Sequence, residues 1–468
     1  GRPDVELGLT VAELDVAADG PPQLAGVGLL AKGKADGGTL ELRATAPHLT
    51  LAAAGPEAAS AEATLRVEGQ GHGGQLRARL TKVRGQDSRL MADSVSGEVD
   101  WKGAAGRLTG HLGGPASWQG EPRVVDLPAL GGEFDFTPSR SGAAALRLTL
   151  QAAARVDVGR NSAAGRFDLR AGDSRIHGAW SLPRLAPLAV GFEVDVDRLD
   201  LDSSSGAAAP RVDLTALHGV DADGVLRIGS LTAAGLRLER LRVPLAAHGG
   251  RLNAAGWSAS LYGGSADGSL SLAADGNRLA VRGTLQNVGL APLLHGAVGR
   301  EALGGSASLA FDLGAAGTTA DELRRSLTGT ANLRLRNGVL HGVDAVALLK
   351  EWRGAIAAHQ PARRPFRENE STPLGDVAVS FRIDGGRARF ADLFGRSAAI
   401  GLNGFGEIDL ASGVIDAVPR WTLLTVAPAD QPQLGSLRGV TVPMRATGPA
   451  GRLDWLLDAN LPAPPVRR

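Results

Sequence analysis

The sequence predicts a mainly β protein whose mostly antiparallel sheet has one apolar face and one solvated face. Three observations lead to this expectation. Apolar and polar residues alternate over many short stretches, which is the side-chain period of a half-buried strand. The 65 glycines supply tight turns between these stretches, and helical periodicity is scarce. Because aromatic residues make up only 4% of the chain, small and medium aliphatic side chains must form most of the apolar face.

Alternating segments recur along the first half of the chain. The longest clean one places five apolar residues on one side, namely Leu188, Val190, Phe192, Val194 and Val196. The other strands predicted here contain residues 5–9, 40–44, 63–67, 76–80, 95–101, 134–136, 146–150 and 167–169. Each has an apolar and a polar side, as expected for an antiparallel sheet that is solvated on one face.

The second half repeats the pattern more regularly, with strands expected around residues 226–228, 236–245, 270–272 and 279–285. A short helix is expected over residues 290–298, where Pro292 suits the first turn. No sequence period of 20 to 50 residues is apparent, so a solenoid array is not indicated.

Two further helices are expected between residues 319 and 358. Thr319 and Glu322 have the spacing of a capping box, which predicts a helix start. A strand over residues 331–335 should then reverse at Asn337-Gly338, a two-residue hairpin signal. The second helix is predicted over residues 343–358, because Val346, Leu349, Trp352 and Ile356 share one helical face.

After a Pro- and Arg-rich loop over residues 360–373, the period returns to two. Val377, Val379, Phe381 and Ile383 alternate with polar or small residues, and Gly385-Gly386 predicts a turn. A β-meander should follow, with its next turn at Ser412-Gly413.

This order of elements resembles the C-terminal region of the AsmA-like family of bacterial envelope proteins. The segments that carry the resemblance are residues 326–349, 374–393, 404–416 and 440–449, with a further block at 223–272. The resemblance implies a long, twisted sheet curled lengthwise into an apolar groove, related to bridge-like lipid transfer proteins. It also implies phospholipid transport between the inner and outer membranes in support of outer-membrane assembly, with outer-membrane assembly proteins as partners.

The resemblance further implies a periplasmic location, with an N-terminal anchor that tethers the protein to the inner membrane. The chain itself starts at Gly1 and contains no run of 18 apolar residues, so we expect neither a signal peptide nor a membrane span within it. The expected regions are an N-terminal β-groove region (1–200), a central AsmA-like β region (201–318), an AsmA-like C-terminal region (319–460) and an extended tail (461–468).

Under this hypothesis, apolar side chains of the alternating strands line the groove and contact phospholipid or another acyl-chain lipid. The candidates are Leu226, Ile228, Leu236, Leu238, Leu241, Val243, Leu270, Leu272, Val377, Val379, Phe381 and Ile383. The alternative is a structural or assembly-assisting β protein of the envelope, with a closed core of the same residues and no lipid cargo.

Other function classes find little support. The net charge of +1 does not indicate a nucleic-acid partner, and there is no cysteine. The nine histidines lack metal-binding spacing, and GxSxG and Walker motifs are absent, so no catalytic residue, metal ligand or cofactor is predicted. Residues 69–74 fit GxGxxG by letter, but the alternating residues after them predict a strand where a dinucleotide site needs a helix.

Two clusters of charge leave alternatives open. Acidic residues between Glu193 and Asp202 suit a calcium site or, more commonly, the solvated side of a strand. Arg363, Arg364 and Arg367, with Arg353 nearby, suit anionic lipid head groups or a solvated loop.

Overall fold

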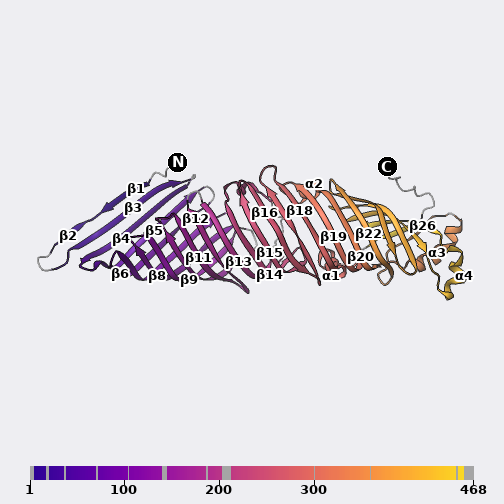
Figure 1. Cartoon of the computed structure of the whole chain (residues 1–468), viewed down its shortest axis with the longest axis horizontal. Helices are drawn as coiled ribbons and strands as arrows, with labels where there is room; N and C mark the ends of the chain where they lie inside the picture. The colour runs from indigo at the N-terminus through magenta and orange to yellow at the C-terminus, as the bar shows by residue number, and fades with distance from the viewer. Residues whose placement is uncertain are drawn as a thin grey trace. The chain divides into compact units, whose positions relative to one another are not determined.

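The computed structural model describes residues 5–16, 20–35, 38–69, 72–103, 105–139, 145–185, 188–202, 212–299, 301–358, 360–449 and 452–457. Within these residues, 27 strands form one open sheet in which the paired strands are antiparallel (Figure 1). The few helices are short, and the longest of them has 14 residues. The predicted mainly β, mostly antiparallel class is therefore confirmed.

The chain divides into two compact units. The first contains the described residues up to Leu199 together with Asp221–Leu226. The second contains Asp200–Asp202, residues 212–220 and the described residues from Arg227 onward. The family-like region boundaries at residues 318 and 460 remain predictions.

The first unit is built from consecutive strands joined by turns. Their bounds are β1 (Val5–Thr10), β2 (Glu13–Asp15), β3 (Gln23–Ala35), β4 (Gly38–Ala52), β5 (Gly55–Gly69), β6 (His72–Gln86), β7 (Arg89–Gly103), β8 (Gly106–Gln119), β9 (Val124–Pro138), β10 (Leu146–Asp157), β11 (Ser162–Ala171), β12 (Ser174–Leu185) and β13 (Leu188–Asp200). Strand β14 (Ala222–Ala233) begins in this unit and ends in the second.

The second unit contains the helices. After the 3-10 turn η1 (Thr215–Gly219) come β15 (Leu236–His248), β16 (Arg251–Leu261), β17 (Gly264–Ala273), β18 (Arg278–Gly289), α1 (Leu290–Val298), β19 (Leu303–Ala316), α2 (Ala320–Ser326), β20 (Thr328–His341) and α3 (Ala345–Ala358). The unit ends with β21 (Ala362–Arg364), β22 (Ser371–Asp384), β23 (Arg387–Arg396), β24 (Ile400–Asp409), β25 (Val414–Leu423), η2 (Pro428–Asp430), α4 (Gln431–Leu434), η3 (Gly435–Leu437), β26 (Thr441–Pro449) and β27 (Asp454–Leu457).

The predicted helices form, and their starts have clear causes. The Thr319 hydroxyl accepts from the Glu322 N–H at 3.2 Å, and the Glu322 carboxylate accepts from the Thr319 N–H at 3.3 Å, which completes the capping box. Helix α1 occupies residues 290–298 as predicted. Helix α3 starts two residues later than predicted, because the Asp344 carboxylate accepts from the N–H groups of Val346 and Ala347.

The hairpin predicted at Asn337-Gly338 is wrong. Strand β20 runs through these residues without reversing, and its register with β22 shifts between Leu335 and Gly338. Asn337 has φ 51°, so it takes the left-handed conformation within a β-bulge. The dipeptide signal identified a special backbone conformation, while pairing with β19 and β22 on both sides kept the strand extended.

Strand pairing aligns the apolar residues of successive strands into continuous rows. One row of the second unit crosses nine strands through Ala254, Leu270, Val281, Leu313, Gly329, Ile383, Ala388, Ile408 and Ile415. A row of the first unit runs through Leu7, Ala31, Leu42, Leu65, Leu76, Val99, Gly110, Phe134, Leu148 and Ala171. We call the side of the sheet that carries such rows the apolar face of each unit.

Glycine has a structural role opposite the large aromatic residues of this face. At five positions a methyl group on the glycine would lie within 3.0 Å of a ring carbon of the residue directly across the ladder. The pairs are Gly74 with Trp101, Gly110 with Phe134, Gly165 with Trp180, Gly268 with Trp257, and Gly283 with Phe311. Each ring therefore lies against the neighbouring backbone, and these glycines are required by packing.

Helices α3 and α4 cover the apolar face beside β26, at the C-terminal end of the second unit (Figure 1). Leu348, Leu349 and Trp352 of α3 are no more than 3% exposed. Beneath them Trp421 and Trp455 pack edge to face, with ring centroids 5.8 Å apart. The buried Thr372 hydroxyl fixes the start of α3, since it donates to the Val343 carbonyl at 2.6 Å and accepts from the Ala345 N–H at 2.9 Å. We call this helix-covered cluster the C-terminal cap.

Among the described residues, no helix has the length and apolar character needed to cross a membrane.

The C-terminal cap should dominate the stability of its surroundings. We expect Leu348→Ala to lower the free energy of unfolding by about 2–5 kcal/mol, because it leaves a cavity in a fully buried cluster. Urea unfolding followed by tryptophan fluorescence measures the change.

Phe394→Ala is the matched control, because it removes a larger side chain from a residue that is 58% exposed. Its cost should stay below about 1 kcal/mol. An equal loss for both variants would contradict the assignment of the core to the cap.

Candidate functional site

The twelve predicted groove residues lie on strands β14, β15, β17 and β22, and eleven of them belong to the second unit. Four are buried, namely Ile228, Val377, Val379 and Ile383. The other eight are half-buried, namely Leu226, Leu236, Leu238, Leu241, Val243, Leu270, Leu272 and Phe381. Ladder pairing brings the β17 and β22 members into the apolar rows of the second unit, where Val379 faces Leu333 and Leu270 faces Val281. Their contact with lipid remains a prediction.

A bulge keeps the β15 members on one side of the strand. Leu238 and Leu241 are three residues apart, so a regular strand would place them on opposite faces. The register with β16 shifts between Glu239 and Arg242, and Arg240 has φ 51°. The extra residue restores the alternation, so that both leucines lie on one side of β15 and the polar Glu239 and Arg242 lie on its other side.

Burial varies along the apolar face of the second unit. Leu335 and Leu349, in the C-terminal cap, are 3% and 1% exposed. Leu270, Val281 and Leu313, on the neighbouring strands β17, β18 and β19, are only half-buried. A closed core would bury these aliphatic side chains as completely as the cap does. In the described chain, the middle of this face therefore remains accessible.

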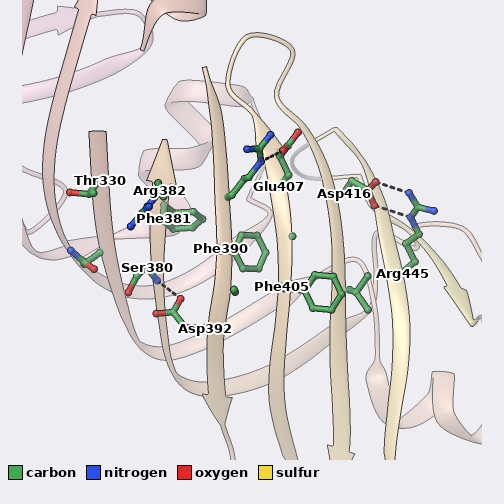
Figure 2. A pocket seen from close by; sticks show the side chains of 15 residues that line it. Thr330, Ser380, Phe381, Arg382, Phe390, Asp392, Phe405, Glu407, Asp416 and Arg445 are labelled. Carbon is green, nitrogen blue, oxygen red and sulfur yellow. Dashed lines mark hydrogen bonds and ion pairs between the residues drawn. The ribbon is translucent and has the colours of Figure 1, made fainter. Parts of the chain in front are cut away.

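A cavity with a volume of about 1010 Å³ lies across β20 and β22–β26. Its lining mixes aromatic, charged and small polar side chains: Thr330, Asn332, Ser380, Phe381, Arg382, Arg389, Phe390, Ala391, Asp392, Phe405, Gly406, Glu407, Asp416, Val418 and Arg445. Figure 2 shows Phe381, Phe390 and Phe405 on the neighbouring strands β22, β23 and β24. We call this cavity the aromatic slot. Its volume is at the upper end of the range usual for small-molecule sites.

A β-bulge shapes the slot. The pairing of β23 is irregular with both neighbours, between Ala378 and Arg382 on β22 and between Phe390 and Leu393 within β23. The Asp392 carboxylate accepts a hydrogen bond from the Ser380 N–H at 2.9 Å, which satisfies a backbone donor at the irregularity (Figure 2). Bulges of this kind redirect side chains and are common next to binding sites.

Three of the ten phenylalanines of the chain line the slot. The rings of Phe381 and Phe390 meet edge to face, with centroids 5.6 Å apart. Phe405 pairs directly with Val418, on the same sides of their strands as Glu407 and Asp416. Its ring also has the Arg420 guanidinium carbon 5.8 Å from its centroid. The slot thus places an apolar patch on a side of the sheet that is otherwise polar.

The polar row that crosses the slot contains several ion pairs. From β17 to β26 it reads Ser269, Arg282, Asp312, Thr330, Arg382, Arg389, Glu407, Asp416 and Thr447. Arg389 Nε lies 2.6 Å from Glu407 Oε2. Arg445 Nε and Nη2 lie 2.8 and 2.6 Å from the two oxygens of Asp416 (Figure 2). The Arg445 hydrogen bonds lower the pKa of Asp416.

Arg382 differs from the other arginines of this row. It is exposed, and within the described chain it makes no hydrogen bond or ion pair. Arg389 faces it directly across the ladder, and two like charges in opposite positions destabilise a sheet. Arg389 is neutralised by Glu407, whereas Arg382, which also lines the cavity, forms no ion pair with a carboxylate of the described chain.

Sequence reasoning identified Phe381 as a site residue but missed the slot. Phe390, Phe405 and Arg382 stand in three separate alternating segments, and only the ladder register brings them together. The local signal that existed was the concentration of phenylalanine in residues 381–405 of a chain with few aromatics.

Within the predicted basic loop, Arg364 has a role that neither alternative expected, whereas Arg353, Arg363 and Arg367 are exposed. Arg364 is 3% exposed and forms ion pairs with Glu351 and Glu370, while Arg363 pairs with Asp454. Because burial of an arginine needs charged partners, this segment holds the cap together and Arg364 is unavailable to a lipid head group. In the described residues, no cluster of three or more His, Asp or Glu side chains is arranged to hold a metal ion.

Comparison with known families gives a match over residues 201–393, to the AsmA family. This segment is an AsmA family domain. It contains nine strands in full, β14 to β22, and part of β23, together with helices α1 to α3. The slot straddles its end, because Arg382 and Phe390 lie inside the AsmA domain whereas Phe405 and Asp416 lie beyond it. No curated protein matches the chain.

The Asp416–Arg445 pair should contribute a pH-dependent stability. The pKa of Asp416 is lower in the folded state than its ordinary value of about 4. The pair therefore stabilises the fold above that ordinary value, and this contribution is lost as pH falls through the lowered pKa. We expect Arg445→Gln to reduce the free energy of unfolding by about 0.2–1 kcal/mol at pH 7, the range of exposed pairs, and by less at pH 3. Urea titrations at both pH values measure the two differences.

Arg334→Gln serves as the control, since Arg334 is exposed and makes no ion pair in the described chain. A loss for Arg445→Gln that is the same at pH 3 and pH 7 would show that the pair does not act through the Asp416 charge.

Proposed function

We propose that this chain is a periplasmic AsmA-like protein that binds phospholipid along its apolar face and conducts it between the inner and outer membranes, in support of outer-membrane assembly. The observation that carries the proposal is the accessible middle of the apolar face in the second unit. There, apolar residues of nine paired strands stand in register, and Leu270, Val281 and Leu313 remain half-buried.

The energetics of this face favour an apolar ligand. Leaving aliphatic surface in contact with water is unfavourable by roughly 25 cal/mol per Å², and each acyl methylene removed from water contributes about 0.8 kcal/mol. Acyl chains laid against Leu270, Val281 and Leu313 would therefore stabilise both ligand and protein.

The same register supports the proposed movement of acyl chains along the face. Each apolar residue has an apolar or glycine partner on the next strand, so a chain that passes from one strand to the next meets no charged side chain within the row. The paired aromatic rings and glycines, such as Phe311 against Gly283, keep bulky groups close to the backbone. Both features suit passage of acyl chains.

Periplasmic location and an inner-membrane tether in the full-length protein belong to the proposal and draw on the AsmA family domain. No catalytic role is proposed. The competing function is a structural envelope protein in which the same residues form a closed core.

A charge in the middle of the apolar face should abolish lipid binding without unfolding the protein. We expect Leu270→Asp to lose most of the phospholipid that co-purifies with wild type, because a carboxylate on this face repels acyl chains while water still reaches the half-buried position. Native mass spectrometry and organic extraction of protein purified from a bacterial envelope measure the lipid, and circular dichroism measures the fold.

Ser271→Asp provides the matched control, since it introduces the same charge one residue along, on the exposed opposite side of β17. It should retain wild-type lipid. A lipid-free wild type, together with a Leu270→Asp variant that unfolds, would identify a closed core and support the structural alternative.

A further inference from the structure

We infer that the aromatic slot is a binding site for a single-chain anionic amphiphile, whose hydrocarbon lies against Phe405 and Val418 and whose phosphate or carboxylate contacts Arg382. The ligand class rests on the proposed function, whereas the location of the site does not. The slot adds to the apolar face a discrete place where an anionic group is recognised.

The hydrocarbon part of the site is given by its apolar lining. Phe405 and the buried Val418 stand on the polar side of β24 and β25, where neighbouring positions carry Glu407 and Asp416. Phe381 and Phe390 (Figure 2) alternate with Arg382 and Arg389 along β22 and β23, so their rings lie on the apolar side of the sheet and do not belong to this patch. An apolar patch on two paired strands suits a hydrocarbon chain better than a compact polar ligand.

Arg382, which has no ion-pair partner in the described chain, would bind the anionic group of the ligand. Figure 2 shows Arg382 beside Phe381, while the Glu407 and Asp416 carboxylates are bonded to arginines of their own. An anion at Arg382 would also relieve its repulsion with Arg389 across the ladder. Guanidinium groups bind phosphate and carboxylate oxygens through two parallel hydrogen bonds.

The polar part of the slot otherwise has balanced charge. Arg382, Arg389 and Arg445 line it together with Asp392, Glu407 and Asp416. Because Asp392 accepts from the Ser380 N–H and the other two carboxylates accept from arginines, each acid already has a donor. A cationic ligand would have to compete with those donors, whereas an anionic ligand meets a free cation.

Binding of dodecyl phosphate, compared with dodecanol and inorganic phosphate, tests the inference by isothermal titration calorimetry below the micelle concentration. We expect wild type to bind dodecyl phosphate about tenfold more tightly than dodecanol, as one charge-assisted interaction would give. Arg382→Gln should remove this preference and leave the affinity for dodecanol unchanged. Phe405→Ser should weaken binding of both dodecyl compounds.

Arg334→Gln is the matched control, because it removes an exposed arginine of β20 that lies outside the slot. It should bind as wild type does. Inorganic phosphate that binds as tightly as dodecyl phosphate would identify a simple anion site and overturn the amphiphile assignment.

Leu270→Asp separates this inference from the proposed function. If the slot is a distinct site, this variant loses co-purified phospholipid but still binds dodecyl phosphate with the Arg382-dependent preference. If Arg382→Gln has no effect while Leu270→Asp abolishes all binding, the slot is rejected and the lipid-binding face stands. If Arg382 governs binding although wild type carries no co-purified lipid, the slot stands and the proposed function fails.

Discussion

The structure depends on one constraint, which is that apolar side chains must stay on one face through every ladder of a very wide sheet. Side chains alternate with a period of two. A single uncorrected insertion would therefore move the apolar side chains of the rest of the strand to the opposite face of the sheet. Bulges correct such insertions, as between Leu238 and Leu241, where Arg240 takes the left-handed conformation. At Gly256 a similar shift keeps Trp257 on the same side of β16 as Ala254.

This constraint explains which parts of the fold the sequence predicts. Strands with alternating leucine and valine, such as β10 and β22, were recognisable because their pattern alone identifies an apolar side. Strands β3, β8 and β12 were missed. Strand β8 contains Gly110, Gly113 and Gly114, which resemble turn residues until Phe134 is seen lying against Gly110 from the next strand. Such glycines can be interpreted only with their cross-strand partner.

The same reasoning explains the limits at the candidate site. Apolar alternation pointed to Val379 and Phe381 as members of one face, and the register places them there. Alternation alone could not predict the slot, because its residues come from β20 and β22–β26. Its charge also depends on which side chains pair across the ladders. In the sequence, Arg382 and Arg389 look alike. Only the position of Glu407 opposite Arg389 distinguishes a satisfied arginine from an available one.

Stability and accessibility are located in different parts of the second unit. The C-terminal cap has nearly complete burial, a fixed helix start at Asp344 and Thr372, and an arginine held by two carboxylates. The middle of the apolar face has the same kinds of side chains without that cover. Since exposed aliphatic surface contributes little to folding, the cap and the ladder hydrogen bonds must maintain the fold there. A sheet maintained in this way can keep an apolar face open to a ligand, which a protein that relied on the same residues for its core could not do.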